Sequence, residues 1–140
     1  MSTIVDRDTF MKHLRKSGLL TQRQYEIAVE KLACVQKPRE IAKALASWKL
    51  LTKFQAASLL TGRRSGFFIG PYRILDEIGR GAMGRVYKAV HESMNRVVAL
   101  KVLSSRVTDT ERALALFRRE VQTAAKLNHA NIVLAYDAAE

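Results

Sequence analysis

The sequence is short of the residues that cross-links and metal clusters require. It contains one cysteine, Cys34, among 140 residues, so an internal disulfide and a multi-cysteine metal cluster are excluded. The three histidines, His13, His91 and His129, are too scattered to form a helical metal-binding pair. We therefore expect no zinc site and no other bound metal in this stretch of sequence.

Long apolar runs are also absent. No uninterrupted apolar stretch approaches the roughly 18–20 residues that cross a bilayer, and Asp6, Arg7 and Asp8 stand where a signal peptide would need an apolar core. The composition, 48% hydrophobic and 26% charged, is that of a soluble globular protein and excludes wholesale disorder. The sequence predicts a cytoplasmic chain, and a membrane span beyond residue 140 of a longer parent stays open.

Acidic residues are few compared with basic ones. The chain has 24 Lys and Arg against 13 Asp and Glu, a formal net charge of +11. Residues 1–66 carry 13 basic and 5 acidic side chains, and residues 67–140 carry 11 and 8. A basic half suits a nucleic acid or an acidic surface as partner. We favour a solvated helical surface, because no recognised nucleic-acid motif accompanies the charge.

The hydrophobic period changes across the short polar segment 62–66, from helical before it to strand-like after it. This change predicts an α+β chain of two domains: a helical accessory domain over residues 1–66 and a sheet-containing domain over residues 67–140. The helical half contains an internal repeat of the form LLTxxQ, at residues 19–24 and 50–55. In each copy the Thr and the Gln three residues later form the pattern of a capping box.

These start signals predict helices over about 7–17, 22–35, 38–47 and 53–61, arranged as two helix pairs in a small bundle. In the second half, β-branched and aromatic residues predict strands over 72–78, 85–90, 96–103 and 131–136. A further capping box at residues 108–111 opens a predicted helix that runs to about residue 127.

Gly79, Gly81 and Gly84 form a GxGxxG pattern, which alone is a weak signal. A dinucleotide-binding fold needs a helix after the third glycine, whereas here Val86 and Tyr87 begin a strand. The loop therefore joins two antiparallel strands, the geometry of a glycine-rich lid over nucleotide phosphates. A glycine-rich hairpin turn without a ligand is the alternative.

Lys101 interrupts an apolar strand, and Glu120 lies within the apolar stripe of the predicted long helix. A charge in an apolar setting needs a partner. One ion pair between the two explains both positions, with the Lys101 ammonium also reaching phosphates. The alternatives are a Lys101 that reaches solvent from a strand edge and a Glu120 that pairs with Arg118 or Lys126.

Four segments in order resemble the N-terminal lobe of bacterial serine/threonine protein kinases of the eukaryotic-like type. They are GRGAMGRV at 79–86, VALK at 98–101, FRRE at 117–120 and LNHANIV at 127–133. Leu100 replaces the usual isoleucine and Ala130 the usual proline. The resemblance covers half of the chain and its motifs are specific. Residues 1–66 bear a softer resemblance to the helical segment that precedes such kinases in planctomycete-type bacteria.

The resemblance implies an antiparallel sheet with one helix, ATP and Mg²⁺ as cofactors, and protein substrates with Ser or Thr hydroxyls. It implies Lys101 and Glu120 as the catalytic residues and the Mg²⁺ ligands in a missing C-terminal lobe. The ATP-binding residues it implies are Ile78, Gly79, Arg80, Gly81, Ala82, Met83, Gly84, Val86, Ala99 and Lys101.

The catalytic-loop aspartate and asparagine and the metal-binding DFG aspartate of this family have no counterpart in the 140 residues. The sequence therefore predicts an N-terminal kinase fragment that transfers negligible phosphate alone. Two alternatives stay open: a non-catalytic basic helical adaptor with a vestigial kinase lobe, and a nucleic-acid-binding module with such a lobe.

Overall fold

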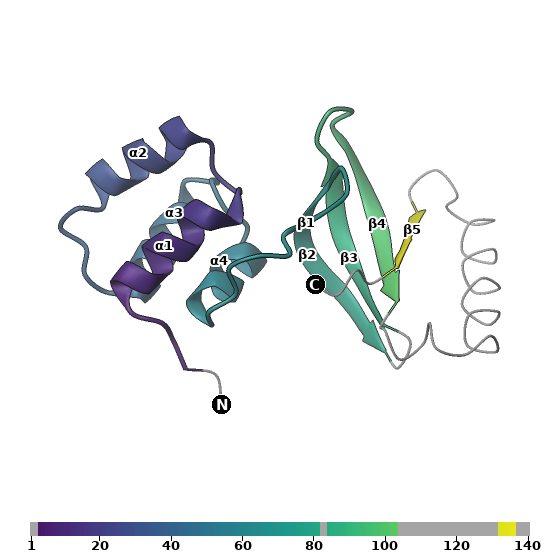
Figure 1. Cartoon of the computed structure of the whole chain (residues 1–140), viewed down its shortest axis with the longest axis horizontal. Helices are drawn as coiled ribbons and strands as arrows, with labels where there is room; N and C mark the ends of the chain where they lie inside the picture. Colours follow the sequence, from purple (N-terminus) through teal and green to yellow (C-terminus); the bar gives the residue numbers. More distant parts are fainter. Residues whose placement is uncertain (1–2, 82–83, 104–131, 137–140) are drawn as a thin grey trace. The chain divides into compact units, whose positions relative to one another are not determined.

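A computed structural model describes residues 3–81, 84–103 and 132–136 of the chain. The chain divides into two compact units, Met1–Phe68 and Ile69–Glu140 (Figure 1). The first unit contains helices and the second a sheet. The division falls just after the segment 62–66, at which the hydrophobic period of the sequence changes.

The helical unit contains α1 (Arg7–Ser17), α2 (Gln22–Lys31), α3 (Pro38–Ser47) and α4 (Lys53–Leu60). The predictions for α1 and α3 are confirmed, and α4 ends one residue early. The prediction for α2 was wrong at its end, since the helix stops at Lys31 instead of residue 35. The side chain of Arg7 donates to the carbonyls of Val35 and Leu32, at 2.8 and 3.3 Å. This long-range contact binds carbonyls beyond the helix end, and helical periodicity does not encode it.

Both copies of the LLTxxQ repeat form the predicted capping box. In the first, the Gln24 N–H donates to Thr21 Oγ1 at 3.1 Å and the Thr21 N–H donates to Gln24 Oε1 at 2.8 Å. In the second, Gln55 and Thr52 make the same two bonds at 3.1 and 2.9 Å. The repeat in sequence is therefore a repeat in local structure, one at the start of α2 and one at the start of α4.

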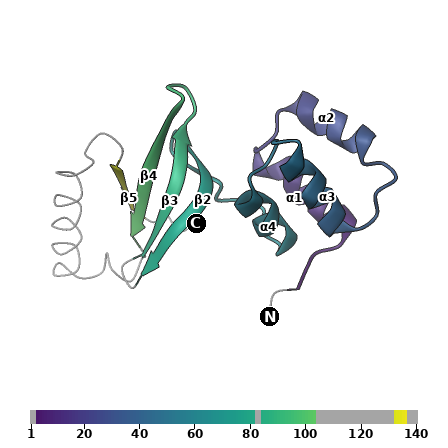
Figure 2. The same ribbon diagram turned by 180° about the vertical axis from the view of Figure 1, so that it is seen from behind.

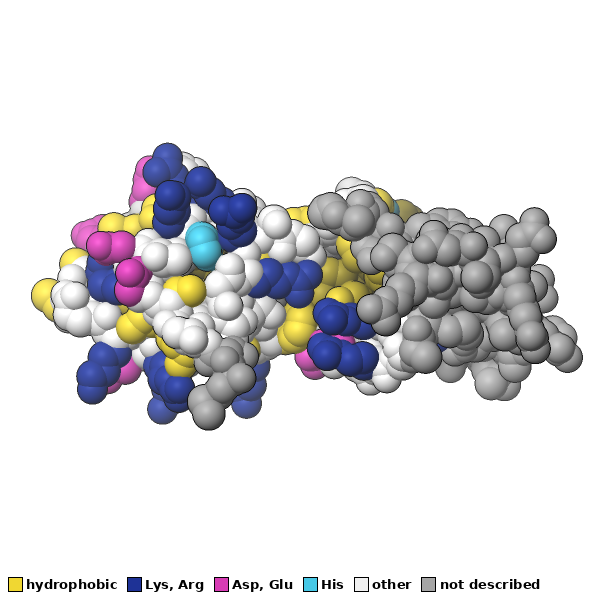
Figure 3. Space-filling view, turned by 60° about the horizontal axis from the view of Figure 1, so that its bottom comes forward, with side chains coloured by type: hydrophobic (Ala, Val, Ile, Leu, Met, Phe, Trp, Pro, Cys, Tyr) yellow, Lys and Arg dark blue, Asp and Glu magenta, His cyan; other side chains and the backbone are white. Residues whose placement is uncertain are grey.

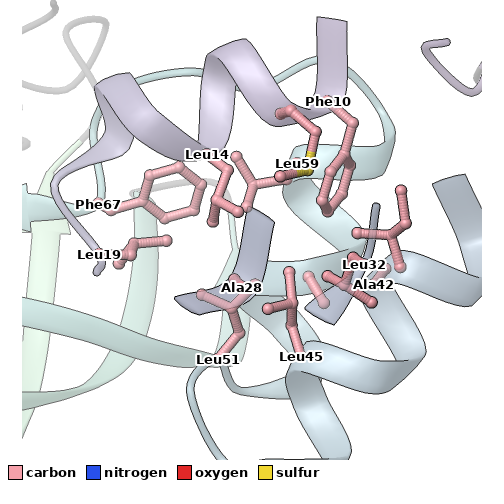
Figure 4. Packing of buried hydrophobic residues seen from close by; sticks show 13 residues of the cluster. Phe10, Leu14, Leu19, Ala28, Leu32, Ala42, Leu45, Leu51, Leu59 and Phe67 are labelled. Atoms are coloured by element: carbon pink, nitrogen blue, oxygen red, sulfur yellow. The ribbon is translucent and has the colours of Figure 1, made fainter. Parts of the chain in front are cut away.

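The core of the helical unit is a single cluster of apolar side chains drawn from all four helices and their connections. Figure 4 shows these side chains converging between the helices. The largest fully buried members are Phe10, Phe67, Leu14, Leu19, Ile41, Leu45 and Leu59. Phe67 lies after the helices, so the segment that follows α4 also packs into this core.

The second unit is a sheet of β1 (Phe68–Ile69), β2 (Tyr72–Gly81), β3 (Gly84–His91), β4 (Arg96–Leu103) and β5 (Ile132–Tyr136), in that order. Figure 2 shows the larger strands side by side from behind. Strands β2, β3 and β4 pair antiparallel, which confirms the predicted sheet and the α+β class.

The last strand pair departs from a fully antiparallel sheet, because β5 pairs with β4 in parallel. A parallel pair cannot be joined by a tight turn and needs a crossover. Residues 104–131, which include the predicted helix over 108–127, connect the two strands and lie outside the described residues.

One face of the sheet is buried. The register places Ile74, Ala89 and Val98 in one cross-strand row, and Tyr87 and Leu100 in another. All five side chains are buried, and alternation along β3 and β4 puts the two rows on the same face. The opposite face is therefore the one on which polar side chains and a ligand can lie.

Candidate functional site

The three motif glycines lie at the turn between β2 and β3. The register pairs Gly79 with Val86 and Gly81 with Gly84, so that only Ala82 and Met83 stand between the paired strand ends. These two residues, predicted to bind the nucleotide, lie outside the described residues. The prediction that strand structure ends before Gly79 was wrong: β2 continues to Gly81. Pairing with β3 extends the strand through the glycines, which a pattern read along one segment does not reveal.

At two of the three positions the structure shows why the residue is glycine. Gly84 has φ 143°, a backbone conformation that residues with a Cβ rarely adopt. A Cβ at Gly79 would lie 3.6 Å from Cβ of Val86, so the missing side chain leaves the space above Val86 open. Backbone that is free of side chains is what a bulky anion needs in order to approach main-chain N–H groups.

The predicted strand residues come together in one row. Val86 pairs with Gly79 on one side and with Lys101 on the other. Paired residues in antiparallel strands have Cβ atoms roughly 4.5–5.5 Å apart and on the same face. Ala99 shares that face, because it lies two residues before Lys101 on β4. All four residues are half-buried, in contrast to the buried residues of the other face.

Ile78, the residue before the first glycine, has no partner in the register of β2 and β3. The register shifts between Glu77 and Gly79, which leaves Ile78 as the extra residue of a β-bulge. Its side chain is 57% exposed. A large apolar side chain that is mostly in water, next to the row of Gly79, Val86 and Lys101, is a surface on which a flat apolar ligand could pack.

An ion pair that the sequence did not predict lies at the base of the glycine turn. The Arg80 guanidinium donates to both carboxylate oxygens of Glu77, at 2.8 and 3.2 Å, and Arg85 lies 4.0 Å from the same carboxylate. The hydrogen bond to Glu77, and then its negative charge, raise the pKa of Arg80. The signal was the Glu and Arg three residues apart. In a regular strand, residues three apart lie on opposite faces, so this spacing does not predict a contact. The bulge at Ile78 shifts the alternation by one residue and brings Glu77 and Arg80 to the same face.

Glu120, the predicted partner of Lys101, lies outside the described residues, so their ion pair stays a prediction. In the described part of the chain, no three His, Cys, Asp or Glu side chains are grouped as metal ligands would be. No helix described here has the length and hydropathy of a bilayer span. The described residues of the candidate site are thus the glycines of the turn, the exposed apolar side chain of Ile78 and the half-buried Lys101 on one sheet face.

Comparison with known proteins finds similarity in the second half of the chain. Residues 72–140 match the family described as protein kinase domain. The chain is 42% identical over 66 residues to the serine/threonine-protein kinase pkn3 of Myxococcus xanthus, covering 47% of this chain and 12% of that protein. It is 41% identical over 75 residues to PknD of Mycobacterium tuberculosis, covering 54% of this chain and 11% of that protein.

A third relative, the serine/threonine-protein kinase PrkC of Bacillus subtilis, is 40% identical over 82 residues, or 59% of this chain and 12% of that protein. The chain thus spans about an eighth of the length of each of these curated relatives. No solved structure matches it significantly. The region that matches the family begins at Tyr72, the first residue of β2, and the helical unit precedes it in the sequence.

Proposed function

Because residues 72–140 match the protein kinase domain family, we propose that they form the phosphate-binding half of an ATP site in a serine/threonine kinase. The observation that carries this proposal is the cross-strand row of Gly79, Val86 and Lys101. The row places a lysine on the sheet face that also presents the glycine turn. The adaptor and nucleic-acid alternatives both include a vestigial kinase lobe, and they give this arrangement no role.

In the proposed site the main-chain N–H groups of the glycine turn, from Gly79 to Gly84, bind the phosphates of ATP. The Lys101 ammonium contacts the α- and β-phosphates, and Glu120 orients it. Ile78, Val86 and Ala99 pack against the adenine. Ala82 and Met83 would contribute main chain at the tip of the turn, and Arg80 would add positive charge beside it.

Mg²⁺, when bound with ATP, would supply positive charge that offsets the charge of the phosphates. Its ligands are expected in residues that follow a kinase N-terminal lobe, since the DFG and catalytic-loop motifs do not occur in the 140 residues. The proposal therefore assigns nucleotide binding to this chain and phosphoryl transfer to a longer protein with a C-terminal lobe. In a radiolabel assay the 140-residue polypeptide should transfer negligible phosphate, and clear turnover would contradict this.

The test of the site is a titration of the 140-residue chain with a fluorescent ATP analogue. Lys101→Ala should weaken binding by about tenfold or more, because a charge-assisted contact to phosphate is lost. Arg85→Ala is the matched control: it removes one positive charge from β3 next to Val86, on the opposite face. The control should change the affinity by less than about twofold.

Equal losses in the two variants would show that net charge, and no specific site, attracts the nucleotide. Unchanged binding by Lys101→Ala would contradict the proposal directly. Far-UV circular dichroism of both variants separates a loss of the site from a loss of the fold.

We also propose that residues 1–66 are an accessory domain of the kind that precedes kinases in planctomycete-type bacteria. The paired capping boxes of the LLTxxQ repeat support a defined helical domain at this position. Expression of residues 1–68, which retains the buried Phe67, tests the proposal, since an accessory domain should give a cooperative thermal transition by itself.

A further inference from the structure

The helical unit has an open groove between α3 and α4, with a volume of about 480 Å³. The four α3 positions 39, 42, 43 and 46, followed by Ser47, line one side, and the four α4 positions 53, 56, 57 and 60 line the other. Both sets have the spacing i, i+3, i+4, i+7, so the groove runs along one continuous stripe of each helix. None of these residues belongs to the proposed nucleotide site.

The floor of the groove is apolar and its rim is basic. The residues that line the floor are mostly alanines: Ala42, Ala46, Ala56 and Ala57, with Leu60 at one end. Arg39, Lys43 and Lys53 supply the charge, and all three are exposed. No acidic side chain lines the groove. Alanine side chains end at Cβ, so larger apolar side chains from outside can reach down between the two helices.

The surroundings strengthen this positive charge. Residues 41–66 contain no Asp or Glu but five Lys and Arg, and the nearest carboxylate in sequence is that of Glu40, one turn before Lys43 on α3. Figure 3 shows Lys and Arg side chains in several groups over the face of the helical unit that it presents. An occupant with carboxylates at its edges would meet complementary charge at the rim.

We propose that this groove binds an amphipathic helix of a partner protein, with an apolar stripe that packs on the alanine floor and Asp or Glu on both flanks. Helix-in-groove recognition uses anchors at i, i+3, i+4 and i+7, the same spacing that builds the two walls. A single-stranded nucleic acid fits less well, because it needs aromatic side chains for base stacking and no aromatic residue lines the groove. A second copy of the chain also fits less well, since none of α1 to α4 contains more than two acidic residues.

The test uses the 140-residue chain and a labelled synthetic peptide of about 18 residues, long enough to form a helix. The peptide carries Leu along one face and Glu on both flanks, and a matched peptide carries Lys in place of every Glu. Fluorescence anisotropy should show saturable binding of the Glu peptide and none of the Lys peptide. In amide NMR spectra, the peptide should shift the signals of Ala46 and Ala57 and leave those of the sheet unchanged.

Two variants test the groove itself. Lys43→Glu combined with Lys53→Glu should lower the affinity for the Glu peptide by about tenfold or more, because two of the three rim charges are reversed. Lys12→Glu combined with Lys16→Glu is the matched control: it changes the net charge equally on exposed positions of α1 that do not line the groove. It should change the affinity by less than about twofold. Ala57→Phe, at an exposed position, fills the groove without changing charge and should also weaken binding.

Three results would overturn the proposal. The first is equal weakening by the two charge variants, which would mean attraction by net charge alone. The second is self-association of the chain that Lys43→Glu with Lys53→Glu abolishes, which would assign the groove to a second copy. The third is a DNA or RNA oligonucleotide that shifts the Ala46 and Ala57 signals while the Glu peptide does not. If circular dichroism shows that the charge variants do not fold, the test rests on Ala57→Phe. Binding of the Glu peptide to that variant with unchanged affinity would contradict the proposal.

Discussion

The two units of this chain bury their apolar side chains in different ways. The helices of residues 7–60 close around one cluster, with Phe10, Ile41 and Leu59 fully buried. The sheet buries one face and leaves Val86, Ala99 and Lys101 half-buried on the other. In the described part of the helical unit no charged side chain is buried, whereas in the sheet a cation lies among apolar residues on a face that is only partly covered.

This difference indicates where each unit can bind something. A sheet with one incompletely covered face can take a ligand against that face, which suits a nucleotide between the glycine turn and Lys101. A closed bundle can bind only on its outer surface, and the groove between α3 and α4 is such a surface. We therefore expect the stability of the helical unit to depend most on its core side chains. We expect the stability of the sheet to depend on the backbone conformation of its glycine turn.

The largest effect should come from opening the closed core. Phe10 is 0% exposed, and Phe10→Ala should lower the free energy of unfolding of the helical unit by about 3–5 kcal/mol. Thermal unfolding followed by far-UV circular dichroism measures it. Ile27→Ala is the control, since Ile27 is 39% exposed on α2 and its loss should cost about 0.5 kcal/mol or less. Equal effects would mean that the cluster around Phe10 is not the core.

The glycine turn should respond to a smaller change. Gly84→Ala should destabilise the sheet by about 1–3 kcal/mol, because alanine strains the backbone at φ 143°. At Gly81 an added Cβ would meet no atom within 4 Å, and Gly81→Ala should cost about 0.5 kcal/mol or less. Urea titrations of the two variants measure the difference. If Gly81→Ala were the more damaging change, the turn would not have the conformation described here.

The repeat offers a comparison inside the helical unit. Gln55 is 2% exposed, whereas Gln24, its counterpart, is half-buried. Gln55→Ala should cost about 1–3 kcal/mol, because it removes a buried side chain together with its hydrogen bond from the Thr52 N–H. Gln24→Ala should cost about 0.5–1.5 kcal/mol, the value of an ordinary hydrogen bond. Thermal unfolding of both variants ranks them, and the opposite ranking would contradict the burial of the second capping box.

The smallest effect concerns pH. Hydrogen bonds from the side chain and the main-chain N–H of Thr9 lower the pKa of Asp6, the N-cap of α1, below its usual 3.8. A lowered pKa contributes stability above the unfolded value, which is lost as the pH falls through the folded value. The melting temperature of the helical unit should therefore fall on acidification below about pH 4. Asp6→Asn retains the cap and should reduce this fall, so an identical pH profile would assign it to other groups.

Local sequence signals predicted most of the secondary structure. Thr21 and Thr52 began their helices as expected, and the strand over 96–103 has the predicted bounds, because capping and alternation act between near neighbours in the chain. The end of α2 was missed because Arg7 binds the carbonyls beyond it. The length of β2 was missed because pairing with β3 extends it.

The candidate site was predicted in part by the same kind of reasoning. The glycine spacing and the position of Lys101 could be identified from the sequence, since each motif lies within a few residues. The contact between Arg80 and Glu77 could not, because it depends on a bulge that strand pairing produces. The partner of Lys101 is still a prediction, as Glu120 lies outside the described residues.

The amino-acid order alone determined where the helices begin, which residues alternate along the strands and which motifs the second half shares with kinases, since these depend on short-range geometry. Tertiary structure decided which motif residues are neighbours: Gly79, Val86 and Lys101 form one row only because β2, β3 and β4 pair in a particular register. It also decided that α3 and α4 enclose a groove with a basic rim, because that surface needs two helices at once.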